Sequence, residues 1–161
     1  MCGIAGCSIS QLTSQEVQSL SQRFIEALHH RGPDGNGFWQ ENDNLLLTHN
    51  RLAILDLSEH GRQPMLAESG RYVITFNGEI YNFSRLKSDL EDLGNTFKGR
   101  SDTEVILALV DAYGIEQTLC MIDGMFAFAL YDREREEITI ARDRMGEKPL
   151  FYGWVDGRFV F

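Results

Sequence analysis

The feature that most restricts the fold of this chain is the arrangement of its strand-like segments around short polar turns. Apolar and β-branched residues gather in three adjacent pairs of segments: 38–40 and 45–51, 125–131 and 137–142, and 150–154 and 158–161. Turns of a few residues join antiparallel strands, whereas parallel strands need a crossover of about a dozen residues or more. The pattern therefore favours antiparallel sheets over a parallel doubly wound fold.

Helices are expected between these strands, because apolar residues recur there at helical spacing. Thr13 and Glu16 form a capping box at the start of the first helix. Gly94 and Gly114 are the stop signals of the second and third helices. The predicted class is α+β, with strand 4–9, helix 14–28, strands 38–51, strand 72–76, helices 83–93 and 101–113, a helical turn to 121, and strands 125–161.

Three segments are predicted to be irregular. Residues 31–37 contain three glycines and a proline, which indicates a structured loop that is neither helix nor strand. Residues 58–69 indicate a surface loop, and residues 142–149 a polar connector. With 161 residues, 43% of them apolar, the chain has the size and core of one domain.

The net charge limits the classes of binding partner that the chain is expected to have. Asp and Glu number 24 against 15 Lys and Arg, so the formal net charge is −9, which argues against nucleic acid or an anionic membrane as the main partner. There is no apolar run near the roughly 20 residues that span a bilayer, and no signal segment. Cys2, Cys7 and Cys120 form neither a disulfide framework nor a zinc motif, so no metal site and a reducing compartment, the cytoplasm, are expected. Cys7 and Cys120 are interpreted as small buried residues.

Cys2 is the first candidate for chemistry. Loss of Met1 would leave a thiol and a free α-amine on the same residue. The pKa of an α-amine is about 7.7–8.0, so part of it is unprotonated near neutral pH and can take the thiol proton. The alternative is that Cys2 is merely an early residue of the first strand.

Other residues complete a site for an amino acid, although each has a structural alternative. Asn77 and Gly78 offer two adjacent donors for an oxyanion, or form a hairpin turn. Arg51 can bind a carboxylate bidentately, or form a structural ion pair. Glu79 and Asp102 can hold an ammonium group, or act as a turn residue and a helix cap. His29 and His30, at a helix end, are expected to have structural or solvent-facing roles.

Five motifs together resemble the glutaminase domain of the class II glutamine amidotransferases, and the asparagine synthetase type in particular. They are Met1-Cys2-Gly3-Ile4-Ala5-Gly6, His30-Arg31-Gly32-Pro33-Asp34-Gly35, Arg51-Leu52-Ala53-Ile54, Phe76-Asn77-Gly78-Glu79-Ile80-Tyr81-Asn82 and Ser101-Asp102-Thr103-Glu104. The resemblance implies an N-terminal nucleophile hydrolase fold, a four-layer sandwich with two antiparallel β-sheets between helix layers.

The resemblance also implies roles for particular residues. Cys2 would be the nucleophile, and Asn77 and Gly78 would stabilise the oxyanion. L-glutamine would be bound by these two donors and by five further residues: Arg51, Ile54, Leu55, Glu79 and Asp102. This half-reaction would need no metal or cofactor.

Residues 1–161 are expected to be the glutaminase domain of a longer synthetase, because the chain stops inside an apolar strand. ATP and Mg would be needed only in a C-terminal synthetase domain, which these residues lack. Aspartate is the expected acceptor, and a homodimer is left open. The alternatives are a sugar or another carboxylate as acceptor, or a non-catalytic module that binds glutamine for regulation.

Overall fold

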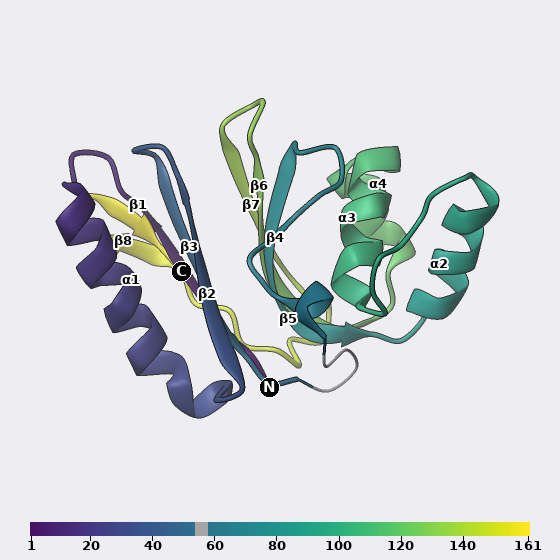
Figure 1. Ribbon diagram of the computed structural model, residues 1–161, viewed down its shortest axis with the longest axis horizontal. Coiled ribbons are helices and arrows are strands. Elements are labelled where there is room, and N and C mark those ends of the chain that lie inside the picture. The colour runs from purple at the N-terminus through teal and green to yellow at the C-terminus, as the bar shows by residue number, and fades with distance from the viewer. Residues whose placement is uncertain (54–57) are drawn as a thin grey trace.

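Two antiparallel sheets form the centre of the computed structural model, in which residues 1–53 and 58–161 are described (Figure 1). Among these residues the first sheet has five strands in the order β2-β3-β1-β9-β8, and the second has four in the order β4-β5-β6-β7. The strands of the first sheet are β1 (Gly3–Ser8), β2 (Gly35–Glu41), β3 (Leu45–Arg51), β8 (Gly153–Val155) and β9 (Arg158–Val160). Those of the second sheet are β4 (Met65–Leu66), β5 (Tyr72–Ile80), β6 (Gly124–Asp132) and β7 (Glu137–Arg142).

The helices cover the outer faces of the two sheets. Helix α1 lies against the first sheet, while α3 and α4 lie on the outer side of the second, with α2 beyond them (Figure 1). The helices are α1 (Ser14–Leu28), η1 (His29–Arg31), η2 (Glu59–Gly61), α2 (Phe83–Asp92), α3 (Asp102–Tyr113) and α4 (Ile115–Met121). The layer order is helix, sheet, sheet, helix, which confirms the predicted α+β sandwich. No described helix is long and apolar enough to span a membrane.

Local sequence signals account for the ends of the helices. The Thr13 side chain accepts from the Glu16 N–H, and Glu16 in turn accepts from the Thr13 N–H at 2.8 Å, so the predicted capping box is formed. Ser101 caps α3 by accepting from the Thr103 N–H at 3.1 Å. Such caps satisfy amide groups that the first turn of a helix leaves without partners.

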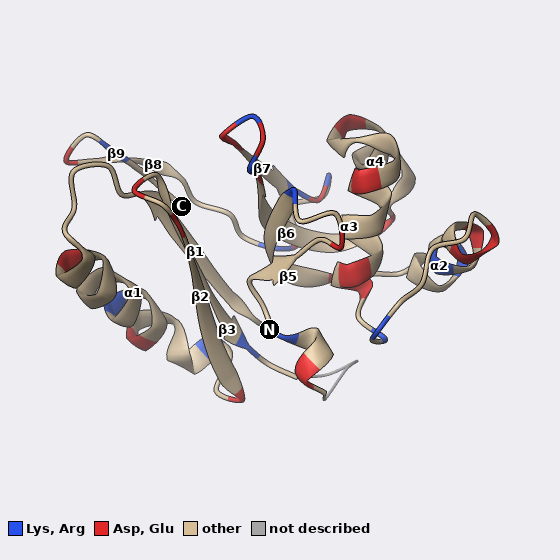
Figure 2. Ribbon diagram, turned by 45° about the horizontal axis from the view of Figure 1, so that its top comes forward, with Lys and Arg blue, Asp and Glu red and all other residues tan. Residues whose placement is uncertain are grey.

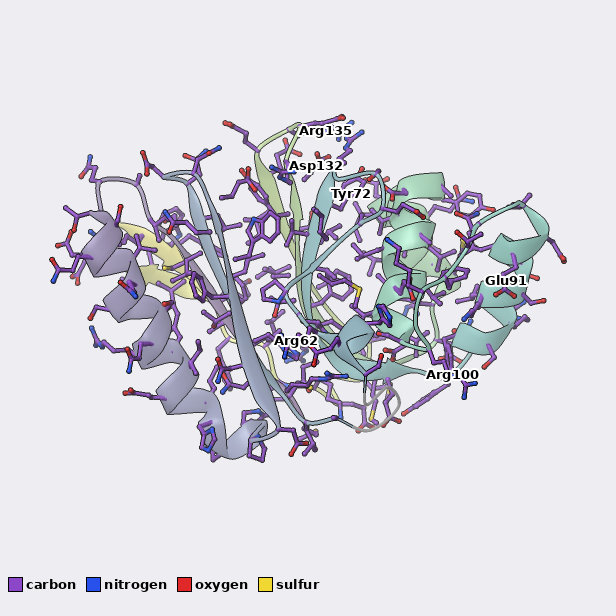
Figure 3. All side chains as sticks on the ribbon, in the orientation of Figure 1. Arg62, Tyr72, Glu91, Arg100, Asp132 and Arg135 are labelled. Atoms are coloured by element: carbon purple, nitrogen blue, oxygen red, sulfur yellow. The ribbon has the colours of Figure 1, made fainter. Side chains whose placement is uncertain are left out.

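Three apolar clusters hold the layers together. One lies between the second sheet and α3 and includes Ile106 and Phe128, and another lies between α1 and the first sheet and includes Val17. The third joins the two sheets through their facing side chains (Figure 3), with Leu47 and Val73 fully buried in it. Charged residues instead lie along α1 and α2 and at the β6–β7 turn (Figure 2).

Several predictions about local structure were wrong in part. The predicted strand 150–154 is shorter and shifted, because β8 begins only at Gly153. Residues 35–37 begin β2, because they pair with residues 49–51 of β3. Cys120 is exposed on α4, whereas Cys7 is buried as predicted. Residues 58–69 contain η2 and β4, and two of them, Gly61 and Ala67, are buried.

A further error concerns the segment 142–149, which is more than a connector. The buried Asp143 carboxylate accepts from the N–H groups of Phe126, Glu147 and Lys148 at 3.1, 2.8 and 3.0 Å. Burial raises the pKa of this carboxyl, but the backbone hydrogen bonds outweigh that effect and hold the pKa below its ordinary value. Asp143 therefore fixes the segment against β6.

Candidate active site

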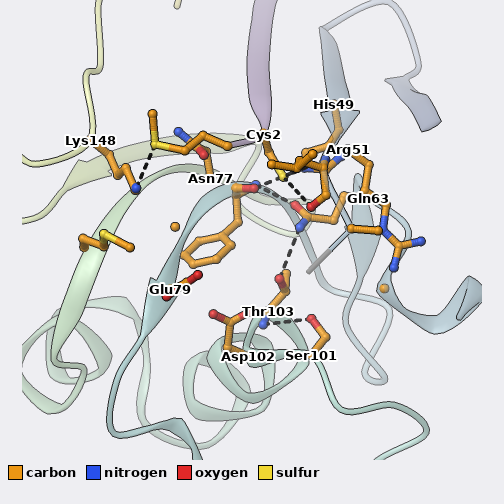
Figure 4. Close-up of a pocket in the computed structure, with 17 residues that line it drawn as sticks. Cys2, His49, Arg51, Gln63, Asn77, Glu79, Ser101, Asp102, Thr103 and Lys148 are labelled. Carbon is orange, nitrogen blue, oxygen red and sulfur yellow. Dashed lines mark hydrogen bonds between the residues drawn. The ribbon is translucent and has the colours of Figure 1, made fainter. Parts of the chain in front are cut away.

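A pocket lies where the start of β1 and the end of β3 meet the second half of β5 and the first turn of α3 (Figure 4). It brings together six of the eight predicted site residues, from the two sheets and α3. Ile54 and Leu55 fall outside the described residues. The pocket is lined by Met1, Cys2, His49, Arg51, Leu52, Ala53, Gly61, Gln63, Phe76, Asn77, Gly78, Glu79, Ser101, Asp102, Thr103, Met125 and Lys148.

Cys2 lies just before β1 and is partly buried. Its Sγ accepts from the Leu52 N–H at 3.4 Å and lies 3.8 Å from the Leu52 carbonyl oxygen, to which the thiol donates. The Arg31 Nε donates to the Cys2 carbonyl oxygen at 3.1 Å. The structure thus fixes both the thiol and the backbone of Cys2 at the pocket.

The loop ahead of β2 supports this arrangement. Asp34 accepts from the Ala53 N–H at 2.9 Å, which fixes the chain beside Leu52. A side chain at Gly32 would overlap the Asn50 carbonyl oxygen, so a glycine is needed there. His29 and His30 are exposed and do not line the pocket, in line with the solvent-facing role predicted for them.

Asn77 and Gly78 lie inside β5, which continues to Ile80. The prediction that the strand ends near Phe76 was therefore wrong, and so is the hairpin-turn alternative. Both residues pair with β6, Asn77 with Ala127 and Gly78 with Phe126. A Cβ at Gly78 would overlap the Met125 carbonyl oxygen and lie 2.7 Å from the Phe126 Cα, so only glycine fits this close approach.

The Gly78 N–H points away from β6. In an antiparallel strand, alternate residues direct their N–H and C=O groups to the same side. The N–H groups of Phe76 and Ile80 donate to the side chains of Gln63 and Asp102, which lie outside β6. Gly78 sits between them, and no described side chain accepts from its N–H. The direction of this group fits the predicted role as an oxyanion donor.

Residues of opposite charge reach the pocket from different elements (Figure 4). Arg51 comes from the end of β3, and its guanidinium donates to the Ser58 carbonyl oxygen at 2.9 Å. Glu79 comes from β5 and Asp102 from the first turn of α3. Asp102 is not the helix cap, because Ser101 has that role.

Asp102 is held in an unusual environment for a carboxylate. It is 6% exposed and accepts from the Ile80 N–H at 3.1 Å. Burial raises its pKa from 3.8 to about 6, and the nearby charge of Glu79 adds to the shift, while backbone hydrogen bonds oppose it. A cationic group bound between Glu79 and Asp102 would relieve both effects, as expected for an ammonium site.

Sequence analysis did not single out three polar side chains that line the pocket: His49, Gln63 and Lys148. Lys148 is 5% exposed, and its Nζ donates to the Met1 Sδ at 2.9 Å. His49 carried a signal, because it lies two residues before Arg51 in the same strand and so on the same face. Within residues 1–53 and 58–161, no group of three or more His, Cys, Asp or Glu side chains could hold a metal ion.

The chain is similar to known proteins over its whole length. The probable glutamine-hydrolysing asparagine synthetase of Dictyostelium discoideum is 42% identical over 100% of this chain and 29% of its own length. For asparagine synthetase B of Escherichia coli the identity is 39%, over 96% of this chain and 27% of the relative. This chain thus spans less than a third of the length of these curated relatives.

A solved structure shows the same fold. The glutamine phosphoribosylpyrophosphate amidotransferase of Bacillus subtilis matches 99% of this chain and 41% of its own, with a TM-score of 0.78 and 20% identity. The sequence model of the glutamine amidotransferase domain matches residues 1–161. Together with the two synthetases, that match shows that this chain belongs to the glutamine amidotransferase domain family.

Proposed function

We propose that the chain hydrolyses L-glutamine to glutamate and ammonia, with Cys2 as the nucleophile after Met1 is removed. The proposal rests on one observation. A single pocket holds the Cys2 thiol, the Gly78 N–H, which points away from β6, and both positively and negatively charged side chains. These groups match a glutamine molecule, which has an amide at one end and a carboxylate and an ammonium at the other.

The reaction begins with proton transfer from the Cys2 thiol to the α-amine of the same residue. In the structure Met1 precedes Cys2, so this nitrogen is part of a peptide bond until Met1 is lost. The thiolate then attacks the amide carbon of glutamine, and the carbonyl oxygen becomes an oxyanion that the Asn77 side chain and the Gly78 N–H stabilise. Removal of one such donor typically lowers kcat by about 10²–10³.

The intermediate collapses when the amide nitrogen takes the proton from the α-amine and leaves as ammonia. The product on the enzyme is a γ-glutamyl thioester, which water hydrolyses to glutamate while the thiol regains its proton. These steps involve only residues of the chain, the substrate and water, and the absence of a cofactor from this half-reaction stays a prediction.

Substrate position is set by charge. Arg51 would bind the α-carboxylate, while Glu79 and Asp102 would bind the α-ammonium; Ile54 and Leu55 remain predicted contacts. These interactions hold the amide carbon near Cys2, and such positioning can contribute several kcal/mol to catalysis, on the order of 7–11 in favourable cases.

The fate of the ammonia depends on what accompanies this domain. Its relatives include glutamine-hydrolysing asparagine synthetases of which the chain spans 27–29%. We infer that residues 1–161 are the glutaminase domain of a longer synthetase that uses ATP and Mg to amidate aspartate in the cytoplasm. Aspartate as the acceptor follows from these relatives, and the cytoplasmic location from cysteines that form no disulfide framework.

The decisive test is glutamine hydrolysis by the chain from which Met1 has been removed, with the intact mass confirming the processing. Cys2→Ala should abolish ammonia release, and Cys2→Ser should reduce it severely because a hydroxyl is much harder to deprotonate than a thiol. Full activity in Cys2→Ala would disprove the mechanism. An inactive, correctly processed wild-type chain that still binds glutamine would favour the non-catalytic regulatory module.

A further inference from the structure

Half of strand β5 lacks a neighbouring strand on one side. Strand β4 pairs only with Val73 and Ile74, so from Phe76 onward the edge of β5 opposite β6 has no strand partner among the described residues. An open edge of this kind leaves backbone N–H and C=O groups without ladder partners. Here the open stretch carries Asn77 and Gly78, the two proposed oxyanion donors.

Two side chains take the place of the missing strand at Phe76. The Gln63 Oε1 accepts from the Phe76 N–H at 2.6 Å, and the His49 Nε2 donates to the Phe76 carbonyl oxygen at 3.2 Å. His49 belongs to β3 of the opposite sheet, whereas Gln63 lies between η2 and β4. Both hydrogen-bonding groups of Phe76, directly before Asn77, are thus held by side chains from two separate parts of the chain. Figure 4 shows His49, Gln63 and Asn77 in the pocket.

Both side chains are themselves fixed. The Gln63 Nε2 donates to the Thr103 hydroxyl at 3.2 Å, which ties it to the first turn of α3 beside Asp102. His49 is 1% exposed, and burial lowers the pKa of its imidazole to about 4. The ring is therefore neutral near pH 7 and carries one N–H, which must be on Nε2 because a carbonyl oxygen only accepts.

We propose that Gln63 and His49 are positioning residues that clamp the Phe76 backbone and so hold the Asn77 and Gly78 donors at the oxyanion of the reacting glutamine. This inference rests on the proposed glutamine hydrolysis. Neither side chain needs to touch the substrate. Oxyanion donors act because they are held in place before charge develops, and a misplacement of about 1 Å can cost about 10²-fold in rate.

The test compares variants that remove the clamp with a matched control in the Met1-free chain. Gln63→Met removes the acceptor with little change of shape, and His49→Leu removes the donor; His49→Gln keeps an amide N–H near the Nε2 position. The control is Thr75→Val, because the Thr75 hydroxyl makes a similar buried bond from β5 to the Thr48 carbonyl oxygen of β3, at 3.0 Å.

Glutamine hydrolysis should separate these variants. Gln63→Met and His49→Leu should lower kcat by about 10–100-fold while KM stays within about threefold, since the lost interaction acts in the transition state. His49→Gln should recover most of the loss, and Thr75→Val should stay near wild type. Equal kcat values for Gln63→Met, His49→Leu and the control would overturn the inference.

A second readout distinguishes positioning from general damage. A chloroketone analogue of glutamine reacts with Cys2 through an oxyanion, whereas iodoacetamide alkylates the same thiol without one. Gln63→Met should slow the chloroketone reaction about as much as kcat and leave the iodoacetamide rate unchanged. A parallel fall of both rates would show a merely structural role and overturn the inference.

The wild-type chain separates this inference from the function on which it rests. If the processed wild type does not hydrolyse glutamine, both are overturned. If it does and Gln63→Met is as active, only the clamp is rejected. Should His49→Leu fail to fold, Gln63→Met still decides the outcome.

Discussion

The two ends of the space between the sheets differ sharply in chemistry. At the end away from the pocket, here called the far end, six apolar residues pack together: Leu45, Leu47, Val73, Ala129, Tyr131 and Phe161. Arg133 and Glu41 form an ion pair of 2.8 Å at this end. Figure 3 shows Tyr72, Asp132 and Arg135 at the same end of the second sheet. The pocket end instead contains Cys2 and the polar side chains around it.

Strands β3 and β5 contribute side chains to both ends of this space. Alternate residues of a strand share a face. Each of these strands therefore presents to the opposite sheet a series of side chains that changes from apolar to polar and charged along the strand. In β3 the series is Leu45, Leu47, His49 and Arg51, and in β5 it is Val73, Thr75, Asn77 and Glu79. Stability is thus expected from one end of these strands and catalysis from the other, which mutations at each end can test.

The largest effect on stability is expected at the far end. Leu47 is fully buried, so Leu47→Ala should lower the free energy of unfolding by about 2–5 kcal/mol through lost burial and a cavity. Denaturation by urea measures this change. The kcat of the folded fraction should remain near wild type, and a loss of kcat comparable with that of Asn77→Ala would remove the proposed division between the two ends.

At the pocket end, the expected effects should appear in the rate. Asn77→Ala should lower kcat for glutamine by about 10²–10³-fold, since it removes one of two oxyanion donors. Steady-state kinetics of the Met1-free chain measures it, with Leu47→Ala as the control for stability. Should kcat stay within about twofold of wild type, Asn77 would not be an oxyanion donor.

Glutamine affinity should depend on pH through Asp102. Its pKa is about 6, and only the carboxylate attracts an ammonium group. In the unreactive Cys2→Ala chain, calorimetry should therefore show binding that weakens about tenfold per pH unit below pH 6. Asp102→Asn should bind weakly at every pH. An affinity that is constant between pH 5 and 8 would exclude Asp102 from the ammonium site.

The smallest effect is expected on the stability of the fold in acid. There the titrations of His49 and Asp102 change the free energy of unfolding in opposite directions. The pKa of Asp102 rises on folding from 3.8 to about 6, so its folded form gains protons first and stability rises as pH falls through about 6. The pKa of His49 falls from 6.5 to about 4, so stability is lost as pH falls through this range.

Single substitutions should reveal each contribution. Asp102→Asn should make the chain more sensitive to acid and His49→Gln less, with a difference of about 1 kcal/mol at pH 5. Urea denaturation between pH 5 and 7 measures both slopes. If the slopes do not change, neither group titrates differently in the folded and unfolded chains.

Sequence alone predicted what depends on neighbours along the chain. The capping box of Thr13 and Glu16 needs contacts within three residues, and it forms, whereas the cap of α3 is Ser101 and not Asp102. The motifs also brought Cys2, Arg51 and Asn77 to one pocket, as the resemblance implied.

Long-range contacts account for what sequence alone missed. Asn77-Gly78 has the composition of a turn, but pairing with β6 keeps it in the strand. Gln63 and His49 contact Phe76 across 13 and 27 residues, so no local pattern revealed them. Cys120 has apolar neighbours in sequence, yet α4 turns it outward while Thr118 is buried.

The glycine in β5 has an evolutionary consequence. Because any side chain at Gly78 would overlap the Met125 carbonyl oxygen, the donor at this position cannot be altered without disturbing the β5–β6 pair itself. Relatives that lose activity while keeping the fold are therefore expected to change Cys2 or Asn77 and to retain this glycine. A glycine at this position therefore indicates that the fold is kept, whereas Cys2 and Asn77 together indicate that the activity is kept.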